Sequence, residues 1–293
     1  MSVKAPLIWG KPKNYPHSTE EEKALLPWRK VEVGHDQIYE FVNNGIKTSK
    51  YEPWNFLVLF LLEEFNPHTK VANLYFLCIA CLQMIKPISN TNGIPTFLIP
   101  LTIVVAIDAI FHALEDYARH RADHLANITP AVVFVKNENG DGGEFKEVPR
   151  MTLSVGDIVR VDNRKEIPAD CLILSVQEKT DPAQGLCFVE TKQLDGETNL
   201  KSRSALPATL AVINSEAALA ALEGQVEMEH PNNLVDSFMG KVVFENNSFF
   251  EAGAEPFKAT QVIQPSNILL RGCVLRNTDF VYAIVVNTGH DTK

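Results

Sequence analysis

The sequence predicts an α+β membrane protein in which a two-helix transmembrane hairpin is followed by a cytosolic all-β body with a small helical insertion. Two apolar runs, about 71–88 and 94–114, lie on either side of a short turn-rich link. After residue 124 the chain consists of short runs rich in β-branched residues, with one alanine-rich segment among them. We therefore expect a cytosolic lead-in over residues 1–50, an interfacial helix and the hairpin over 51–123, and the all-β body over 124–293.

Composition excludes several classes of protein. The net charge of −9 and the isoelectric point near 5.4 argue against a general nucleic-acid binder, and no lysine- or arginine-rich tract counters them. The five cysteines form no paired framework, which suits a reducing compartment. Cys78 and Cys81 form a C-x-x-C pair inside an apolar run without a second pair or a nearby histidine, so we expect helix packing there and predict no metal site.

The lead-in is polar and rich in breaks. Pro12, Pro16 and Pro27 interrupt regular structure, and no apolar core of the kind found in signal peptides is present. We expect irregular chain up to Lys30, followed by short elements and a turn at Asn43–Gly45.

The membrane part begins with an apolar stretch, Trp54–Phe65, which is too short to span a bilayer and suits an interfacial helix, with a buried soluble helix as the alternative. The next two runs are joined by only a few residues, which favours a transmembrane hairpin over a soluble one. Basic residues beyond both outer ends predict that these ends, and both termini, are cytosolic. Asp108 lies within the second run and should face protein or a water-lined cavity.

The all-β body is marked by β-branched runs bounded by turn residues. Strands are expected over 131–135, 144–148, 155–161, 167–174, 241–250 and 267–286, with a hairpin turn over 139–143. Pro207–Leu222 has the composition of a helix, with Pro207 near its start and Gly224 just past its end. This pattern predicts short strands carrying one small helical insertion.

One loop of this body carries a candidate catalytic carboxylate. A strand-like run ends at Thr191, and a turn at Asp195-Gly196 follows, because glycine accepts positive φ and aspartate can bond its own backbone. The turn places Glu197 on a short, braced loop, where a carboxylate can take a proton from water. A hairpin turn with a solvated glutamate is the alternative, since Asp-Gly turns are common.

The order of these motifs resembles that of the P-type ATPases. A membrane hairpin is followed by Val155–Val159, then Ile167–Asp170, then Asp195-Gly196-Glu197-Thr198. The Asp-Gly-Glu-Thr form is similar to the type IV branch, the phospholipid flippases, whereas cation pumps usually have Thr-Gly-Glu-Ser. Further matching segments are Thr48–Tyr51, Ala72–Leu77, Glu115–His120, Gln193–Lys201, Leu269–Cys273 and Thr288–Lys293. The resemblance covers roughly residues 48–293 and implies that the body is an actuator domain with a distorted jelly-roll fold.

The resemblance also implies roles. Glu197 would position the water that hydrolyses an aspartyl phosphate when the actuator rotates, and Asp195, Gly196 and Thr198 would shape its loop. The chain would be the N-terminal part of an ATP-driven translocase that moves phospholipid from the outer or lumenal leaflet to the cytosolic one. No Asp-Lys-Thr-Gly motif is present, so ATP and Mg²⁺ would bind domains beyond this segment, which is expected to be inactive alone.

The lipid contacts follow from the same resemblance. Residues 83–96 would lie near the outer-leaflet gate, which makes Gln83, Asn90 and Thr91 candidate head-group contacts. Phosphatidylserine flippases often carry two glutamines where this chain has Gln83-Met84, so the head group stays open. For Gln83 the alternative is a polar helix end.

A multi-pass membrane protein of the plasma membrane, Golgi or endosomes, with a transmembrane accessory subunit, is implied as well. Two other functions stay open. One is a cation-pumping P-type ATPase. Two features argue against it: the Asp-Gly-Glu-Thr form of the loop and the lack of an acidic cluster beyond Asp108. The other is a non-catalytic membrane-anchored module that binds a partner, if the chain is complete at Lys293.

Overall fold

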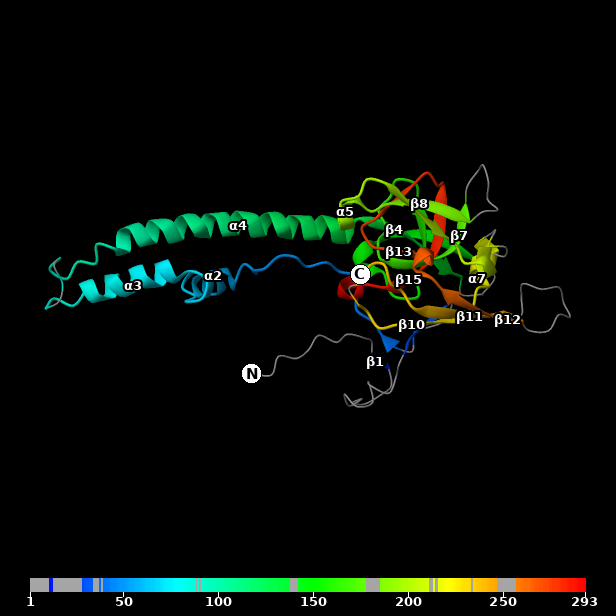
Figure 1. Ribbon diagram of the computed structural model, residues 1–293, viewed down its shortest axis with the longest axis horizontal. Coiled ribbons are helices and arrows are strands. Elements are labelled where there is room, and N and C mark those ends of the chain that lie inside the picture. Colours follow the sequence, from blue (N-terminus) through cyan, green and yellow to red (C-terminus); the bar gives the residue numbers. More distant parts are fainter. Residues whose placement is uncertain are drawn as a thin grey trace. The chain divides into compact units, whose positions relative to one another are not determined.

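The structure is a computed structural model that describes residues 11–12, 28–33, 37, 39–87, 89, 91–137, 142–177, 185–210, 213, 216–232, 234–246 and 257–293. The chain forms two compact units. Unit 1 comprises residues 1–46 and 127–293, and unit 2 comprises residues 47–126. Figure 1 shows that unit 1 contains the β-sheets and that unit 2 consists of helices and their connections.

Unit 1 is built on a six-stranded antiparallel sheet with the strand order β13-β7-β15-β6-β4-β5 (Figure 1). Its strands are Pro130–Lys136 (β4), Gly143–Pro149 (β5), Ile158–Asp162 (β6), Asp170–Gln177 (β7), Ile268–Leu269 (β13) and Phe280–Asn287 (β15). Consecutive residues of β7 and β15 are buried along almost their whole length. Because successive side chains point to opposite faces, both faces of the sheet are covered at these two strands, and the core lies there.

Two smaller sheets complete the body. The four-stranded sheet, in the order β12-β11-β10-β2, consists of Phe257–Ile263 (β12), Gly240–Asn246 (β11), Gly224–Met228 (β10) and Arg29–Val33 (β2). The three-stranded sheet, in the order β14-β8-β9, consists of Val274–Arg276 (β14), Leu186–Glu190 (β8) and Leu200–Ser204 (β9). Lys11–Pro12 (β1) pairs with Tyr39–Glu40 (β3). The expected all-β body is therefore confirmed over the described residues.

The short helical segments of unit 1 connect these strands. They are Lys192–Asp195 (α5), Pro207–Leu210 (α6) and Glu216–Ala220 (α7), with 3₁₀ turns at Arg150–Thr152 (η1), Pro265–Asn267 (η2) and Gly289–Asp291 (η3). The expected single helix over Pro207–Leu222 is wrong, because the structure has α6 and α7 as separate short helices there. Residues 211–212 and 214–215 between them lie outside the described residues. So do residues 138–141 of the expected hairpin turn, although β4 and β5 pair up to Lys136 and Gly143.

The lead-in contributes a strand that the sequence did not indicate. Irregular chain was expected up to Lys30, but β2 begins at Arg29 and pairs with β10. Val31 lies opposite Val226, and both side chains are fully buried. The strand forms because β10, nearly two hundred positions away, supplies the apolar surface on which it packs. The local sequence around Arg29 does not indicate this partner.

Buried side chains join the lead-in to the last residues of unit 1. Asn44 is fully buried, and its Nδ2 donates to the carbonyl oxygens of Arg150 and Pro168, both at 3.0 Å. The backbone N–H of Gly289 donates to Asn44 Oδ1 at 3.2 Å. Asp170, also buried, accepts the backbone N–H of Lys293 at 2.8 Å. In place of the turn expected at Asn43–Gly45 the structure has a bend at Asn44, whose side chain anchors the segments at Arg150, Pro168 and Gly289.

Unit 2 contains three helices: Phe56–Glu64 (α2), Val71–Gln83 (α3) and Leu98–Ile128 (α4), the last of which runs on into unit 1. Among the described residues, α4 alone is long and apolar enough to cross a membrane, and its most apolar 18-residue stretch has a mean hydropathy of 1.9. Its 31 residues extend about 46 Å, against a hydrocarbon core of about 30 Å. The 13 residues of α3 extend only about 20 Å, so the predicted two-helix transmembrane hairpin is not confirmed.

The helix limits differ from those expected. α3 ends at Gln83 rather than near residue 88, and Ile88 lies outside the described residues. α4 begins at Leu98 rather than residue 94 and continues well past Leu114. Pro100 is tolerated because the first turn of a helix needs no intrahelical N–H donors. Beyond Leu114 the side chains become polar but remain good helix formers, so the hydropathy profile underestimated the helix.

Charged groups connect the helices of unit 2. Lys70 Nζ lies 2.5 Å from Glu64 Oε2 and 3.1 Å from Asp108 Oδ2, and Asn73 Nδ2 donates to Glu64 Oε1 at 2.8 Å. Glu64 is fully buried, at the end of α2. Asp108 thus faces protein groups, as expected for an ionisable side chain in an apolar helix.

Candidate functional site

The candidate site is the connection between β8 and β9. The two strands pair with Glu190 opposite Leu200, which fixes both ends of the connection. Between them α5 forms one helical turn, in which the backbone N–H groups of Leu194 and Asp195 donate to the carbonyl of Thr191 at 2.8 and 3.1 Å. The turn ends at Gly196, whose φ of 76° lies in the left-handed region that glycine adopts without strain.

Asp195 organises this loop. Thr191 Oγ1 donates to its carboxylate at 2.9 and 3.0 Å, and the backbone N–H of Glu197 donates to its Oδ1 at 2.9 Å. Lys201 Nζ donates to its Oδ2 at 2.6 Å. Lys201 first, and then the Glu197 N–H, hold the pKa of Asp195 down at about 2. The carboxylate therefore stays ionised and keeps the loop in one conformation.

Glu197 is the exposed group of the loop. Its side chain is 57% accessible, and its Oε2 lies 3.3 Å from Lys201 Nζ. All residues from Lys192 to Leu200, Thr198 among them, are exposed. Within unit 1 the carboxylate therefore meets solvent, where it can accept a proton or contact a second surface brought to it.

The structure brings together most of the residues that the sequence singled out. Asp195, Gly196 and Glu197 form a turn in which the aspartate bonds the backbone two residues on, as expected. Thr191 and Lys201, which also bind the Asp195 carboxylate, were not predicted as parts of the loop. The available signal was their spacing, four residues before Asp195 and four after Glu197, together with the pairing of β8 and β9.

The strand before the loop is joined to its neighbour by an ion pair, and the cysteines in and beside these two strands are unreactive. Arg276 Nη2 of β14 pairs with Glu190 Oε2 at 2.7 Å, which links the strand before the loop to its neighbour. Burial raises the pKa of the Cys187 thiol to about 12 and that of Cys273 to about 11. Neither thiol is therefore a nucleophile at neutral pH.

The two candidate lipid contacts that the structure describes, Gln83 and Thr91, lie in unit 2 and have different hydrogen-bond partners. Gln83 Nε2 donates to Thr96 Oγ1 at 3.1 Å, and Gln83 Oε1 accepts the backbone N–H of Phe97 at 3.2 Å. Thr91 Oγ1 donates to the carbonyl of Ile94 at 2.6 Å. Asn90 lies outside the described residues. Gln83 therefore joins the end of α3 to the start of α4, and its head-group role stays a prediction.

Two family models match most of the chain. Residues 26–97 match the family described as "Phospholipid-translocating ATPase N-terminal", and residues 128–293 match the "P-type ATPase actuator domain". The chain is 36% identical over 291 residues to human phospholipid-transporting ATPase ID, covering 99% of this chain and 22% of the relative. It is 39% identical over 254 residues to phospholipid-transporting ATPase IC of Xenopus tropicalis, covering 87% of this chain and 18% of the relative.

Mouse phospholipid-transporting ATPase FetA is 35% identical over 281 residues, which cover 96% of this chain and 21% of that protein. The chain thus spans about a fifth of the length of the curated relatives it matches. The order of motifs, the loop carrying Glu197 and these matches agree. The chain belongs to the type IV P-type ATPases, the phospholipid-transporting branch, and comprises the N-terminal and actuator portion of that family.

Proposed function

We propose that this chain supplies the actuator and the first membrane segments of an ATP-driven phospholipid translocase. In this proposal lipid moves from the outer or lumenal leaflet to the cytosolic leaflet. The carrying observation is the loop at Glu197: an exposed carboxylate on a turn that Asp195 holds rigid. The names of the relatives, which are phospholipid-transporting ATPases, support the substrate class.

The proposed chemistry is the breakdown of a phosphorylated aspartate that belongs to another part of the full-length enzyme. Glu197 would take a proton from the attacking water or orient it, once the actuator brings the loop to the phosphoryl group. Asp195, Gly196 and Thr198 would shape the loop. Over the described residues no cluster of three or more histidine, cysteine, aspartate or glutamate side chains could hold a metal. Membership of the P-type ATPases supports the use of ATP and Mg²⁺, whose binding we assign to domains outside this chain, and the chain is expected to be inactive alone.

The membrane part of the proposal keeps the hairpin. α4 supplies one span, and α3 with the residues after it would supply the other. The domain limits remain 1–50 for the lead-in, 51–123 for the membrane part and 124–293 for the actuator. Both termini would be cytosolic, in a multi-pass protein of the plasma membrane, Golgi or endosomes that pairs with a transmembrane accessory subunit. Gln83, Asn90 and Thr91 would contact the head group near the outer gate.

The decisive experiment follows phosphoenzyme decay in the full-length protein, with Glu197→Gln, while candidate phospholipids are added one at a time. We expect phosphoenzyme to form from ATP in both proteins, one lipid to speed its decay in the parent, and the variant to stay phosphorylated. Removal of a general base typically slows its step by about 10²–10⁴-fold.

The matched control is Glu144→Gln. Glu144 is also an exposed glutamate of unit 1, 63% accessible, and pairs with Lys146 at 2.6 Å. Its replacement should leave phosphoenzyme decay unchanged. Normal decay in Glu197→Gln would refute the role of the loop. Acceleration by a cation in place of any lipid would move the protein to the ion pumps, and absence of phosphoenzyme would favour the anchored partner-binding module.

A further inference from the structure

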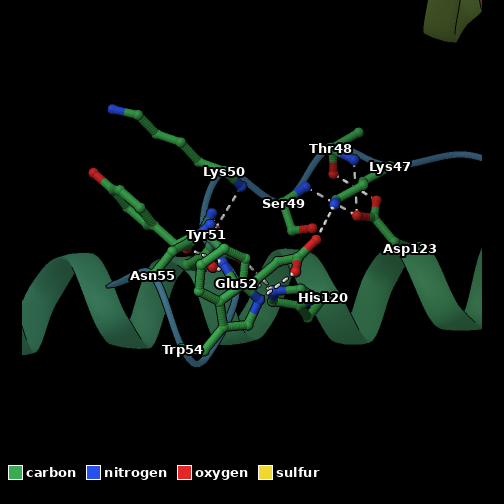
Figure 2. A network of polar contacts seen from close by, with 11 residues as sticks. Lys47, Thr48, Ser49, Lys50, Tyr51, Glu52, Trp54, Asn55, His120 and Asp123 are labelled. Carbon is green, nitrogen blue, oxygen red and sulfur yellow. Dashed lines mark hydrogen bonds and ion pairs between the residues drawn. The ribbon is translucent and has the colours of Figure 1, made fainter. Parts of the chain in front are cut away.

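Two segments of the sequence have no part in the chemistry proposed above, and the structure shows that they bind each other. Thr48–Tyr51 is extended and precedes α2, and Glu115–His120 lies in α4. Figure 2 shows the extended segment running along α4, with His120 and Asp123 on the facing side of the helix. Both segments belong to unit 2.

Asp123 binds the first half of the extended segment. Its Oδ2 accepts the backbone N–H of Thr48 at 2.8 Å and that of Ser49 at 2.9 Å (Figure 2). Its Oδ1 accepts the hydroxyl of Thr48 at 2.5 Å. Three donors thus converge on one carboxylate that is only 8% exposed. Hydrogen bonds to an ionised acceptor are about twice as strong as neutral ones, which compensates the burial of the charge.

Asp116 binds the second half. Its Oδ1 accepts the backbone N–H groups of Lys50 at 2.7 Å and Tyr51 at 3.3 Å. His120 Nε2 lies 2.8 Å from the carbonyl oxygen of Tyr51 and 3.4 Å from Asp116 Oδ2. Asp116 is also 8% exposed. Four consecutive backbone N–H groups of the segment are therefore bound by two carboxylates of one helix.

The spacing of these contacts follows from backbone geometry. Asp116, His120 and Asp123 are separated by four and three residues, so they lie on one face of α4. The seven residues from Asp116 to Asp123 rise about 10.5 Å along a helix, and the three steps from Thr48 to Tyr51 rise about 10 Å along an extended chain. The two antiparallel segments therefore stay in register over this whole length.

The side chains of the same segment bind α2. Lys50 Nζ and Tyr51 OH both donate to Glu63 Oε2, the latter at 2.6 Å. The Tyr51 ring meets the Phe56 ring edge to face, with 5.2 Å between centroids. The segment thus binds α4 through its backbone and the Thr48 hydroxyl, and α2 through the side chains of Lys50 and Tyr51. The chain enters unit 2 at Lys47, directly before these contacts.

We propose that Asp116 and Asp123 are positioning residues that fix Thr48–Tyr51 to α4, so that this segment, α2 and α4 move as one body during transport. We call the contacts between Thr48–Tyr51 and the two aspartates the clamp. An extended segment without such bonds can rotate about its φ and ψ angles, so its movement need not displace the neighbouring helices. A segment fixed by the clamp moves together with α4 and α2. The inference rests on the proposed function, because it assigns the clamp to the coupling of actuator movement to the lipid-carrying helices.

The clamp itself is tested without any activity, by limited trypsin digestion of the 293-residue chain in detergent. Trypsin cleaves after Lys47 and Lys50, but it needs a backbone free to enter its active site. The isosteric double variant Asp116→Asn/Asp123→Asn removes both charges, so we expect cleavage at these two lysines to become several-fold faster. Glu115→Gln is the control, because Glu115 is the exposed neighbour that pairs with Arg119 instead. Equal cleavage in the double variant and the control would refute the clamp.

Its role in coupling is tested in the full-length protein. The ratio of lipid-stimulated to basal phosphoenzyme decay should fall about fivefold or more in the double variant, the size expected for loss of coupling between two sites. A merely structural role would lower the yield of folded protein and leave this ratio unchanged per phosphoenzyme, as should Glu115→Gln. An unchanged ratio refutes the coupling role. If no lipid stimulates the parent, the proposed function and the coupling role both fail, while the trypsin result still decides the clamp.

Discussion

Lys201 is shared between two carboxylates of the same loop. Its ammonium group lies 2.6 Å from Asp195, which also accepts the backbone N–H of Glu197, and 3.3 Å from the exposed carboxylate of Glu197. The shorter contact shows that the lysine chiefly stabilises the turn, and the longer one that it also restrains the carboxylate of Glu197.

We predict that Lys201→Gln raises the pKa of Asp195 from about 2 towards its usual value, because the first of its stabilising partners is lost while the Glu197 N–H and Thr191 remain. ¹³C NMR of labelled aspartate measures this. In the full-length protein the same variant should slow phosphoenzyme decay less than Glu197→Gln does, and Lys201→Arg should restore it. A decay as slow as that of Glu197→Gln would give the lysine a direct part in the chemistry.

Asp170 makes the stability of unit 1 depend on pH. Burial raises the pKa of its carboxyl to about 6, although the backbone N–H groups of Arg271 and Lys293 oppose this. The folded state therefore holds a proton that the unfolded state has released, and stability falls as the pH rises from about 4 to about 6.

Asp170→Asn isolates the effect of this carboxyl. The difference in unfolding free energy between the parent and the variant removes the contributions of the other titrating groups, which the two proteins share. Between pH 4 and 7 the parent should lose up to about 3 kcal/mol of unfolding free energy relative to this variant. Thermal melts of the chain in detergent across this range measure it. A difference that stays constant with pH would mean that Asp170 titrates normally in the folded protein.

At single residues, the sequence predicted what is local. The turn at Asp195-Gly196 depends on one side chain and one glycine, so it was readable, and with it the exposure of Glu197. The partners of Gln83 could not be predicted, because Thr96 bonds to it only when α3 and α4 lie side by side. The same holds for Asp123, whose donors lie 74 and 75 positions earlier in the chain.

Among the elements, β2 shows how a strand can depend on distant sequence. Val31 is fully buried against β10, between residues whose side chains are partly exposed. We predict that Val31→Ala destabilises unit 1 by about 2 kcal/mol, since two buried carbon groups are removed and a small cavity remains. Chemical unfolding in detergent measures this.

The control for β2 is Lys30→Ala, which removes only a partly exposed ion pair to Glu227 at 3.1 Å. An exposed pair of this kind contributes about 0–1 kcal/mol. Equal losses in the two variants would mean that β2 is not packed in the sheet as described. Several strands of the all-β body, such as β4 and β7, were predictable because their β-branched runs are local patterns, whereas β2, β9, β10 and β12 were not predicted. The limits of α3 and α4 were missed since hydropathy records apolar residues and not helix ends.

At the scale of the whole molecule, the number of membrane spans decides on which side the lead-in lies. If α3 and α4 both cross, the residues before α3 and after α4 share the cytosolic side. If α4 crosses alone, the residues before α3 lie opposite the actuator. α4 is long enough to span the membrane, whereas the 13 residues of α3 span it only together with the residues that follow. The number of spans is therefore decided by measuring the topology.

Single cysteines at three sites distinguish these topologies: the exposed Lys47 before α2 and Leu194 in the actuator loop, and the partly buried Thr91 in the link, each replaced by cysteine. Cys78 and Cys81, which are exposed, are first replaced by alanine. Cys171, Cys187 and Cys273 can stay, because they are buried and burial raises their pKa.

With a membrane-impermeant maleimide on intact cells, the hairpin predicts labelling of Thr91→Cys alone, and labelling of all three after permeabilisation. Labelling of Lys47→Cys in intact cells, with Leu194→Cys protected, would leave α4 as a single span. It would also contradict the clamp, because Asp123 lies at the end of α4 that leads into the actuator and binds the residue next to Lys47. The topology measured at Lys47 therefore tests the hairpin and the clamp together, because both require Lys47 to lie on the same side of the membrane as the actuator.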